Sequence, residues 1–481
     1  MVIPSTKAAG GKVVVMPPGY VERCVLLSKV AGAILIFTCP LWLGMLFFTS
    51  PQEYSYASSL LLVPMLALVT AVIALHLTQG DPYLRGIMMV GLVLHIAASS
   101  IFIWVSFVVY NGVVDAFHYW SIGRLRASQF AILGWSAFPA PYWGTNLIYN
   151  LSGVATLLLG DALPALFVVF SLLSLAGSYL FYRAFRFAFP SGDRWLFGLL
   201  ALLMPSVLFW SSFVGKDALM QLFIAASSLG FARVAQRHDL KGFLLCAVGL
   251  SGAWIIRPHI AAMLAIAMTF PYAANKSNRV KRSVLVKAVR IVLIPALVIG
   301  TYTLIHKSIR ETGSLLDSRS GHSPGAVEQV DMVSKNSQIG GSSFSAGASL
   351  LVRVAESPFL LFRPFPWEMT NSLAIVSVIE SAAWIFLSWT RRRELWLTLK
   401  RWREPYIGFL FMYSVIFLIT FGASIGNFGI LLRERIMLTP LALMILSITP
   451  RSSVARVTRK TRKNHWLGHS RHGLPVERIP A

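Results

Sequence analysis

Apolar stretches of roughly 15 to 24 residues recur along most of the chain, and short polar segments separate them. Because an α-helix rises about 1.5 Å per residue, most of these stretches are long enough to cross the hydrocarbon core of a bilayer. The expected fold is an all-α polytopic membrane protein. The pattern predicts about 12 transmembrane helices, near residues 25–48, 60–77, 87–109, 162–182, 195–212, 218–235, 242–256, 260–274, 289–306, 373–389, 406–422 and 436–449.

The polar segments predict one helical domain between two tails. The domain covers 25–450, the N-terminal tail 1–24 and a basic tail 451–481. Two of its connections are long, at about 110–160 and 307–372. Prolines, glycines and aromatics interrupt the first, which is too broken to cross the bilayer and too apolar to leave it. It therefore predicts helices that lie along the membrane surface.

The spans at 242–256 and 260–274 are short and flank the tripeptide Arg257-Pro258-His259. They are either two tilted membrane helices or one re-entrant hairpin that reaches partway through the bilayer.

Lysine and arginine are distributed unevenly between the two sides of this arrangement. Of the 43 in the chain, 31 fall in segments on the side of the N-terminus and 12 in the opposite loops. Since basic residues are retained in the cytoplasm, both termini are expected there, with the protein in the plasma (inner) membrane. The same rule accounts for the basic run at 456–463 and makes nucleic acid an unlikely explanation for it.

Composition narrows the class further. The 481 residues are 56% hydrophobic and only 13% charged, which excludes an ordinary soluble protein. Cys24, Cys39 and Cys246 lie in or beside apolar stretches, without the spacing of a zinc site or a disulfide framework. The first apolar stretch lacks a cleavage signal after it and is expected to remain as an anchor.

The first candidate for chemistry is the motif Asp115-Ala-Phe-His118-Tyr119-Trp120, which follows the third predicted helix. Asp115 and His118 are three positions apart and are expected to be the catalytic pair. A carboxylate beside a histidine can take a proton from a sugar hydroxyl or hold a metal ion. The alternative is that Asp115 caps the N-terminus of a surface helix.

The second candidate is Lys216-Asp217, at the end of the segment Pro205-Ser-Val-Leu-Phe-Trp210-Ser-Ser-Phe-Val-Gly-Lys-Asp. Trp210 stands where a nucleotide-binding phosphate loop requires glycine, so that motif is excluded. Lys216 and Asp217 remain as substrate-binding candidates at a helix start, which favours an anion. Alternatively, the two side chains pair with each other.

The remaining substrate-binding candidates also precede or interrupt apolar spans. Arg257 and His259 flank a proline, and the arginine suits a phosphate or reaches the head groups. Near the last helix, Glu434 is expected to pair with a neighbouring arginine unless the arginines bind an anion. The full set is Arg257, His259, Arg363, Glu368, Arg433 and Arg435.

The candidate residues are all expected on the same side of the membrane. The predicted topology assigns their loops to one face, opposite to both termini. Cations and one acid that converge there fit a phosphate-bearing substrate presented from the bilayer, such as a polyprenyl phosphate or pyrophosphate sugar.

The acid in the first long outer loop, the surface helices behind it and the Pro-Ser-x-x-Phe-Trp-Ser-Ser-x-x-Gly-Lys-Asp motif together resemble GT-C membrane glycosyltransferases. The sequence is similar in particular to bacterial family-39-like proteins and surface-polysaccharide polymerases, over about 87–450. The resemblance implies a multi-helix fold, a catalytic acid outside the cytoplasm and a sugar donor on a polyprenyl phosphate. Two features depart from the class: the acidic loop follows the third helix rather than the first, and Asp115 has no second carboxylate beside it.

The expected function is transfer of a sugar or oligosaccharide from a polyprenyl-linked donor to a hydroxyl of a glycan or lipid acceptor. Asp115 would be the general base and the cations would neutralise the leaving phosphate. No cofactor is indicated and no metal ligands are assigned, although a divalent metal ion stays open. The alternative is a transporter or flippase for a lipid-linked sugar, a class that commonly shows internal repeats and broken helices.

Overall fold

The structure is a computed structural model. It describes Leu26, Val30 and residues 56–138, 143–237, 239–274, 350–368, 374–424 and 428–448. The predicted helices at 25–48, apart from two positions, and at 289–306 lie outside these residues, as do the tails and most of the loop at 307–372.

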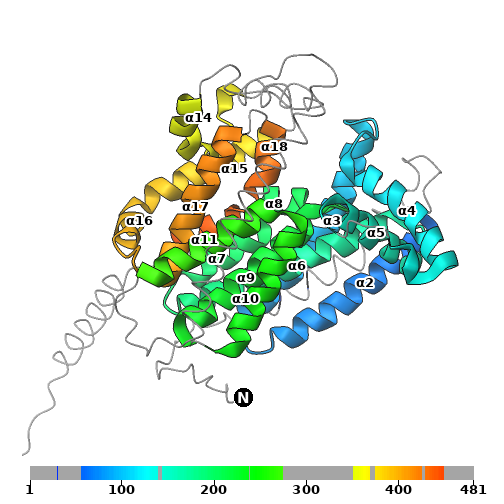
Figure 1. Cartoon of the computed structure of the whole chain (residues 1–481), viewed down its shortest axis with the longest axis horizontal. Helices are drawn as coiled ribbons and strands as arrows, with labels where there is room; N and C mark the ends of the chain where they lie inside the picture. The colour runs from blue at the N-terminus through cyan, green and yellow to red at the C-terminus, as the bar shows by residue number, and fades with distance from the viewer. Residues whose placement is uncertain are drawn as a thin grey trace, which may run out of the picture.

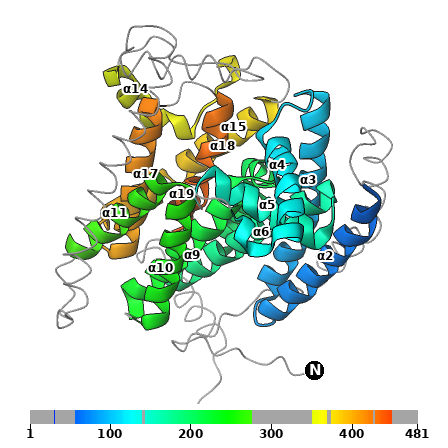
Figure 2. The same cartoon turned by 45° about the vertical axis from the view of Figure 1, so that its right-hand side comes forward.

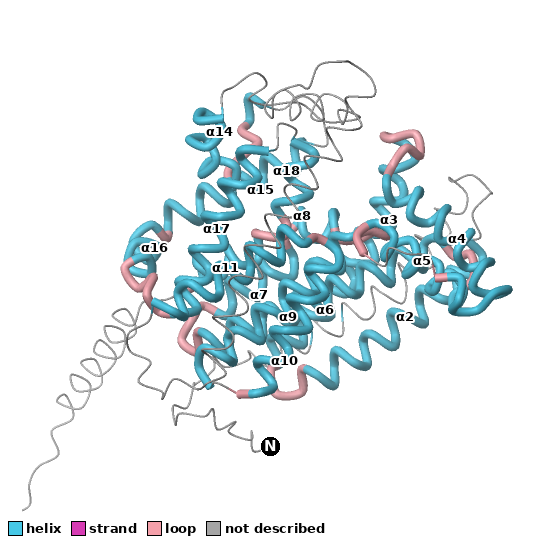
Figure 3. Tube along the Cα trace, in the orientation of Figure 1, coloured by secondary structure: helices cyan, strands magenta, loops and turns pink. Residues whose placement is uncertain are grey.

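The described residues form helices and no strand, as Figure 3 shows. Within the described part of the chain, five helices are long and apolar enough to cross a membrane, so the expected polytopic α-helical fold is confirmed, whereas the count of twelve stays a prediction. The helices are α2 (Tyr56–Leu77), α3 (Pro82–Val108), α4 (Asp115–Leu133), α5 (Thr145–Leu159), α6 (Leu163–Ala188), α7 (Arg194–Leu203), α8 (Pro205–Trp210), α9 (Lys216–Arg237), α10 (Leu240–Ile256), α11 (Pro258–Ala274), α14 (Leu350–Glu356), α15 (Ala374–Thr390), α16 (Arg392–Leu399), α17 (Pro405–Ser424), α18 (Phe428–Arg435) and α19 (Thr439–Ser447), with short 3-10 turns η1 (Gly134–Ala137), η2 (Ser357–Leu361) and η3 (Pro366–Glu368).

One of the expected spans is broken, and a second break in the chain comes before the last span. The stretch 195–212 forms α7 and α8, because Pro205 cannot donate the hydrogen bond that would continue α7. The stretch that was expected to start at 436 is preceded by a separate short helix, α18. Both breaks lie close to the candidate residues and free the chain to turn there.

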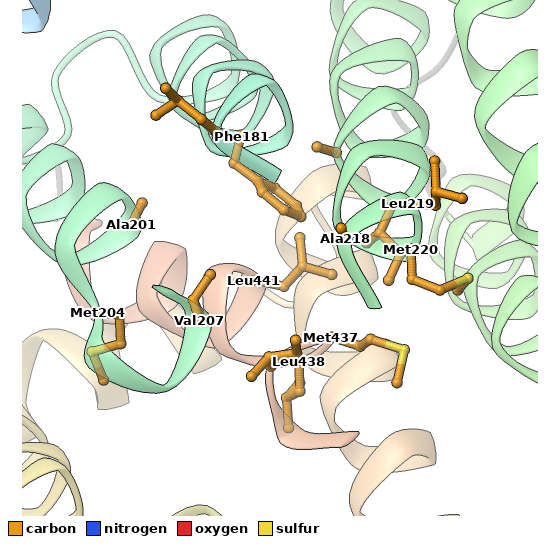
Figure 4. Packing of buried hydrophobic residues seen from close by; sticks show 14 of the residues in the cluster. Phe181, Ala201, Met204, Val207, Ala218, Leu219, Met220, Met437, Leu438 and Leu441 are labelled. Carbon is orange, nitrogen blue, oxygen red and sulfur yellow. The ribbon is translucent and has the colours of Figure 1, made fainter. Parts of the chain in front are cut away.

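Glycines bring α6, α9 and α10 together. A Cβ on Gly177 of α6 would lie 2.9 Å from the backbone of Gln221 in α9, and one on Gly230 of α9 would lie 2.3 Å from the backbone of Cys246 in α10. Helices in lipid gain their packing from such close approach, because the lipid tails are as apolar as leucine. Behind them, Met437, Leu438 and Leu441 pack between α8 and α9 (Figure 4).

The helix bundle has two ends, and aspartate side chains cap helix starts at one of them. At one end, here called the basic end, Asp81, Asp193 and Asp239 accept backbone N–H bonds at the starts of α3, α7 and α10. Asp193 also pairs with Arg391 at the start of α16, with 2.6 Å between Nη2 and Oδ2. At the other end, the cluster end, α3 terminates and α4 and α9 begin. Figures 1 and 2 show α14, α15 and α18 together there.

The helices predicted in the first long loop are α4 and α5, and they pack against each other. A Cβ on Gly123 would lie 2.6 Å from the Cβ of Ser152. Ser152 is buried between them, while Leu133 and Leu158 are exposed at 62% and 77%. The pair therefore holds Asp115, the first residue of α4, against the bundle while presenting apolar side chains outward.

We predict that Gly123→Val separates α4 from α5. Overpacking of this kind destabilises by about 1–3 kcal/mol, so the midpoint of thermal unfolding in detergent should fall. Ala131→Val on the exposed face of the same helix is the matched control, because it adds the same β-branched side chain where there is room. Equal midpoints for the two variants would contradict the close packing.

Candidate functional site

Asp115 lies at the junction of α3 and α4. The N-cap of α4 is Val114, and no side chain caps this helix, so the capping alternative for Asp115 is not what the structure contains. Instead, Asp115 Oδ2 accepts a hydrogen bond of 2.8 Å from Nη1 of Arg433 in α18. Two segments that are 318 positions apart in the sequence thus meet at the candidate base.

Asp217, in the first turn of α9, holds two arginines. Its Oδ2 lies 2.7 Å from Nε of Arg433, and its Oδ1 lies 3.0 Å from Nη2 of Arg257. Arg257 occupies the junction of α10 and α11, where Pro258 interrupts the helix, and it also donates to Glu434. The five residues Asp115, Arg433, Asp217, Arg257 and Glu434, here called the ionic cluster, are joined by alternating charges.

Burial varies strongly along the cluster. The side chain of Asp217 is 1% exposed and those of Arg257 and Arg433 are 10% and 19% exposed, whereas that of Asp115 is 64% exposed. An ion pair strengthens as water is excluded, so the bonds to Asp217 are expected to be the strongest and the bond to Asp115 the weakest. The cluster is fixed at its centre and open at Asp115.

The electrostatics follow from this burial. Burial alone would lower the pKa of Arg433, but the neighbouring Asp217 and Asp115 outweigh it and raise that pKa, so the arginine stays charged. Burial raises the pKa of Glu434, and the charge of Arg257 opposes the rise. Tyr119, one turn after Asp115, has its pKa raised to about 12 by burial, so it remains a neutral phenol.

Lys216 lies beside the cluster without joining it. It is half-buried and within electrostatic range of Asp217, Asp115 and both cluster arginines. The pairing of Lys216 with Asp217 that the sequence left open is absent, because Asp217 is bonded to the arginines. Among the described residues Lys216 has no carboxylate partner, which makes it the cation that is available to an anionic ligand.

Arg435 differs from the expectation of an anion-binding arginine. It is 1% exposed, and it donates to Glu380 Oε1 at 3.1 Å and to the carbonyls of Leu361 and Arg363 at 3.1 and 2.6 Å. Glu380 in turn accepts from the N–H and the hydroxyl of Ser206 at the start of α8. These bonds join η2, α8, α15 and α18, and they assign Arg435 to structure rather than to a substrate.

Glu434 was expected to pair with one of the arginines beside it and pairs with Arg257 instead. In a helix, adjacent residues point in different directions, so neighbours in sequence are poorly placed to meet. The three consecutive charges of α18 therefore serve three different neighbours.

The other sequence candidates lie around these groups. Arg363 pairs with Glu356 and with Glu368, and Glu368 also accepts from the N–H of Phe365, which closes this turn on itself. His118 is exposed with its ring 5.6 Å from that of Tyr149, and His259 is exposed near Phe421. None of these four sequence candidates is bonded to the ionic cluster in the part of the chain that the structure describes.

Sequence reasoning did not select Glu380 as a site residue. The signal was present, because Glu380 is the one acid inside the apolar stretch 373–389, and an acid within a membrane helix is rarely without a partner. Its partner, Arg435, comes from a different helix and is not identifiable by spacing.

The described residues contain no group of three or more His, Cys, Asp or Glu side chains that could hold a metal ion. The acids of the ionic cluster are each bonded to arginine.

Comparison with known protein families gives a match that includes part of this site. Residues 147–302, about a third of the chain, match the family of dolichyl-phosphate-mannose-protein mannosyltransferases. That family is of the GT-C glycosyltransferase type. The match agrees with the resemblance drawn from the sequence motifs and supports a membrane glycosyltransferase of this class.

The matched segment of this glycosyltransferase includes Lys216, Asp217 and Arg257, but not Asp115 or Arg433. Neither curated proteins nor solved structures give a further match.

We predict that Glu380→Gln destabilises the glycosyltransferase, because it leaves the buried charge of Arg435 without a partner. Breaking a buried ion pair costs about 3–5 kcal/mol, so the unfolding midpoint in detergent should fall steeply. Glu394→Gln in α16 is the control, since none of the described residues forms an ion pair with Glu394. A Glu380→Gln protein that is as stable as this control would show that the Arg435 contacts are dispensable.

Proposed function

We propose that the protein transfers a sugar from a polyprenyl-phosphate donor to a hydroxyl acceptor at the extracytoplasmic face. The observation that carries the proposal is that Asp115 from α4, Lys216 and Asp217 from α9, Arg257 and Arg433 meet at one end of the bundle. The matched family is named for a dolichyl-phosphate-mannose donor, which makes polyprenyl-phosphate mannose the first donor to test.

Lys216 is the proposed contact for the donor phosphate. It lies at the start of α9, where the helix dipole also favours an anion. The cluster arginines already have carboxylate partners, so an arriving phosphate either binds Lys216 or replaces one of those partners. The exposed pair between Arg433 and Asp115 is the one that is replaced at least cost.

The reaction follows from these positions. Asp115 takes the proton of the acceptor hydroxyl, and the oxygen forms a bond to the anomeric carbon of the sugar. The bond from that carbon to the phosphate oxygen breaks, and its electron pair leaves with the polyprenyl phosphate. Lys216 and Arg433 stabilise the charge on this leaving group.

This scheme links donor binding to the state of Asp115. While Arg433 is bonded to Asp115 Oδ2, that oxygen is occupied and is not free to accept the proton of the acceptor hydroxyl. When the donor phosphate takes over Arg433, Asp115 is released toward the acceptor. Asp217 keeps Arg433 in place during the exchange through its bond to Nε.

The rival function is a transporter or flippase for a lipid-linked sugar. A purified enzyme in detergent makes the glycosylated product from labelled donor and acceptor. A flippase makes none, because no bilayer separates two compartments there.

We predict that Asp115→Asn abolishes transfer, with a fall in kcat of about 10²- to 10⁴-fold. The same variant should bind polyprenyl phosphate about 1.5- to 5-fold more tightly, because its amide competes less well for Arg433 than an exposed carboxylate does. Transfer is measured with labelled donor in detergent, and binding by calorimetry with polyprenyl phosphate.

Asp161→Asn is the control, since Asp161 pairs with Arg124 on the same surface without touching the cluster. Full activity of Asp115→Asn would remove it as the base. Unchanged or weaker phosphate binding, together with lost activity, would overturn only the exchange at Arg433.

We predict that Lys216→Gln raises the KM for the donor and weakens binding of polyprenyl phosphate by about 10- to 150-fold, since a charged hydrogen bond contributes about 1.5–3 kcal/mol. The KM for the acceptor should change much less. Lys241→Gln at the basic end removes the same charge from an exposed site and is the control. If both variants bind polyprenyl phosphate like the wild type, Lys216 is not the phosphate contact.

A further inference from the structure

We propose that the basic end carries a binding surface for anionic phospholipid head groups, centred on α16. The surface, here called the α16 surface, consists of Arg392, Arg393, Lys400 and Arg403 with Trp389, Trp396 and Trp402. In the view of Figure 1, α16 lies at the margin of the bundle opposite to α4 and α5. The inference concerns a different end of the molecule from the glycosyltransferase site and does not depend on the transfer reaction.

The cations of this surface have no carboxylate partners among the described residues. Two other arginines of the same segment are neutralised, Arg391 by Asp193 and Arg401 by Glu404. The remaining four cations are exposed and have no carboxylate partner among the described residues, and the other acid of the segment 391–404 is the half-buried Glu394. The surface therefore presents positive charge toward its surroundings.

Each of three tryptophans lies beneath one of these cations. Arg392 lies 4.7 Å from the ring centre of Trp389, Lys400 lies 5.2 Å from that of Trp396, and Arg403 lies 5.6 Å from that of Trp402. The tryptophans are 67%, 59% and 40% exposed. Tryptophan favours the boundary between head groups and acyl chains, so these rings indicate the depth at which α16 lies.

The chain connection keeps the surface at the membrane. α16 joins the apolar helix α15 to α17, which starts at Pro405 and is long and apolar enough to cross a membrane. A lipid head group is thus always within reach, whereas a soluble partner would have to compete for the surface.

The charge of the whole end agrees with this occupant. Its described residues include thirteen lysines and arginines against five aspartates and glutamates. The basic residues are Arg85, Arg183, Arg186, Arg194, Arg233, Arg237, Lys241, Arg391, Arg392, Arg393, Lys400, Arg401 and Arg403, and the acidic ones are Asp81, Asp193, Asp239, Glu394 and Glu404. Anionic lipids of the leaflet at this end complement such an excess.

The test compares charge-matched double variants of the full chain. Wild type, R392Q/R393Q and R124Q/R126Q are reconstituted in nanodiscs of phosphatidylcholine with a fifth of phosphatidylglycerol. After extraction, native mass spectrometry measures the ratio of the two lipids that remain bound. Each basic residue near an anionic surface changes binding by about fivefold, so R392Q/R393Q should lower the enrichment of phosphatidylglycerol at least fivefold. R124Q/R126Q, located in α4, should retain the wild-type ratio.

An equal loss in both double variants would show that only total charge matters and would overturn the site. Absence of enrichment in the wild type would also overturn it. The unfolding midpoint of each variant is measured in parallel.

Trp396→Phe is a second variant, which keeps all cations and an aromatic ring but removes the indole. Trp396→Phe should lower the enrichment of phosphatidylglycerol less than R392Q/R393Q does. A larger loss than that of R392Q/R393Q would contradict the role given to the cations.

Discussion

The buried carboxylate of Asp217 is the contact on which the candidate site depends. It bonds Arg257 and Arg433 at once, and these come from the α10–α11 junction and from α18. A single carboxylate at 1% exposure would be costly without partners, and two arginines without it would repel each other. The three charges are therefore stable only together. Their mutual dependence brings segments from the middle and the end of the sequence to the start of α9.

A second buried ion pair, between Glu380 and Arg435, connects further helices to this site. Glu380 and Arg435 connect α15 with α18, and the bonds of Arg435 to the carbonyls of Leu361 and Arg363 add the end of η2 and the turn after it. Because Arg433 lies two residues before Arg435 in the same helix, the bonds of Arg435 also help to fix the position of Arg433. A polar core of this kind specifies geometry, since each bond has a direction, whereas apolar helix packing in lipid is less selective.

The sequence was sufficient for the parts that depend on local chemistry. Apolar length predicted the helices, Pro205 and Pro258 marked breaks, and the motif from Pro205 to Asp217 indicated the glycosyltransferase class. Pairing was not predictable, because it is set by which helix ends meet. Glu434 lies between two arginines in the sequence yet bonds a third, and Arg435, which resembled an anion site, is buried against Glu380. The charged residues in the sequence therefore indicate that an ionic centre exists. Which of them pair with each other is decided by the packing of α9, α10 and α18.

Some ion pairs of the cluster can open to bind a phosphate, whereas others only hold the helices together. In the ionic cluster the negative and positive groups nearly balance, so a phosphate gains little from the cluster unless an existing bond opens. The bond that opens most easily is the one between Arg433 and Asp115, because this pair is exposed to water whereas the pairs at Asp217 are shielded from it. The exposed pair also contains the carboxylate best placed to meet an acceptor. In the proposed reaction the first attraction for the anion comes from Lys216, which is adjacent to Asp217 and has no carboxylate partner among the described residues. The cluster thus combines a centre shielded from water at Asp217 with one exposed edge at Asp115, and in the proposed reaction that edge is where the donor phosphate exchanges.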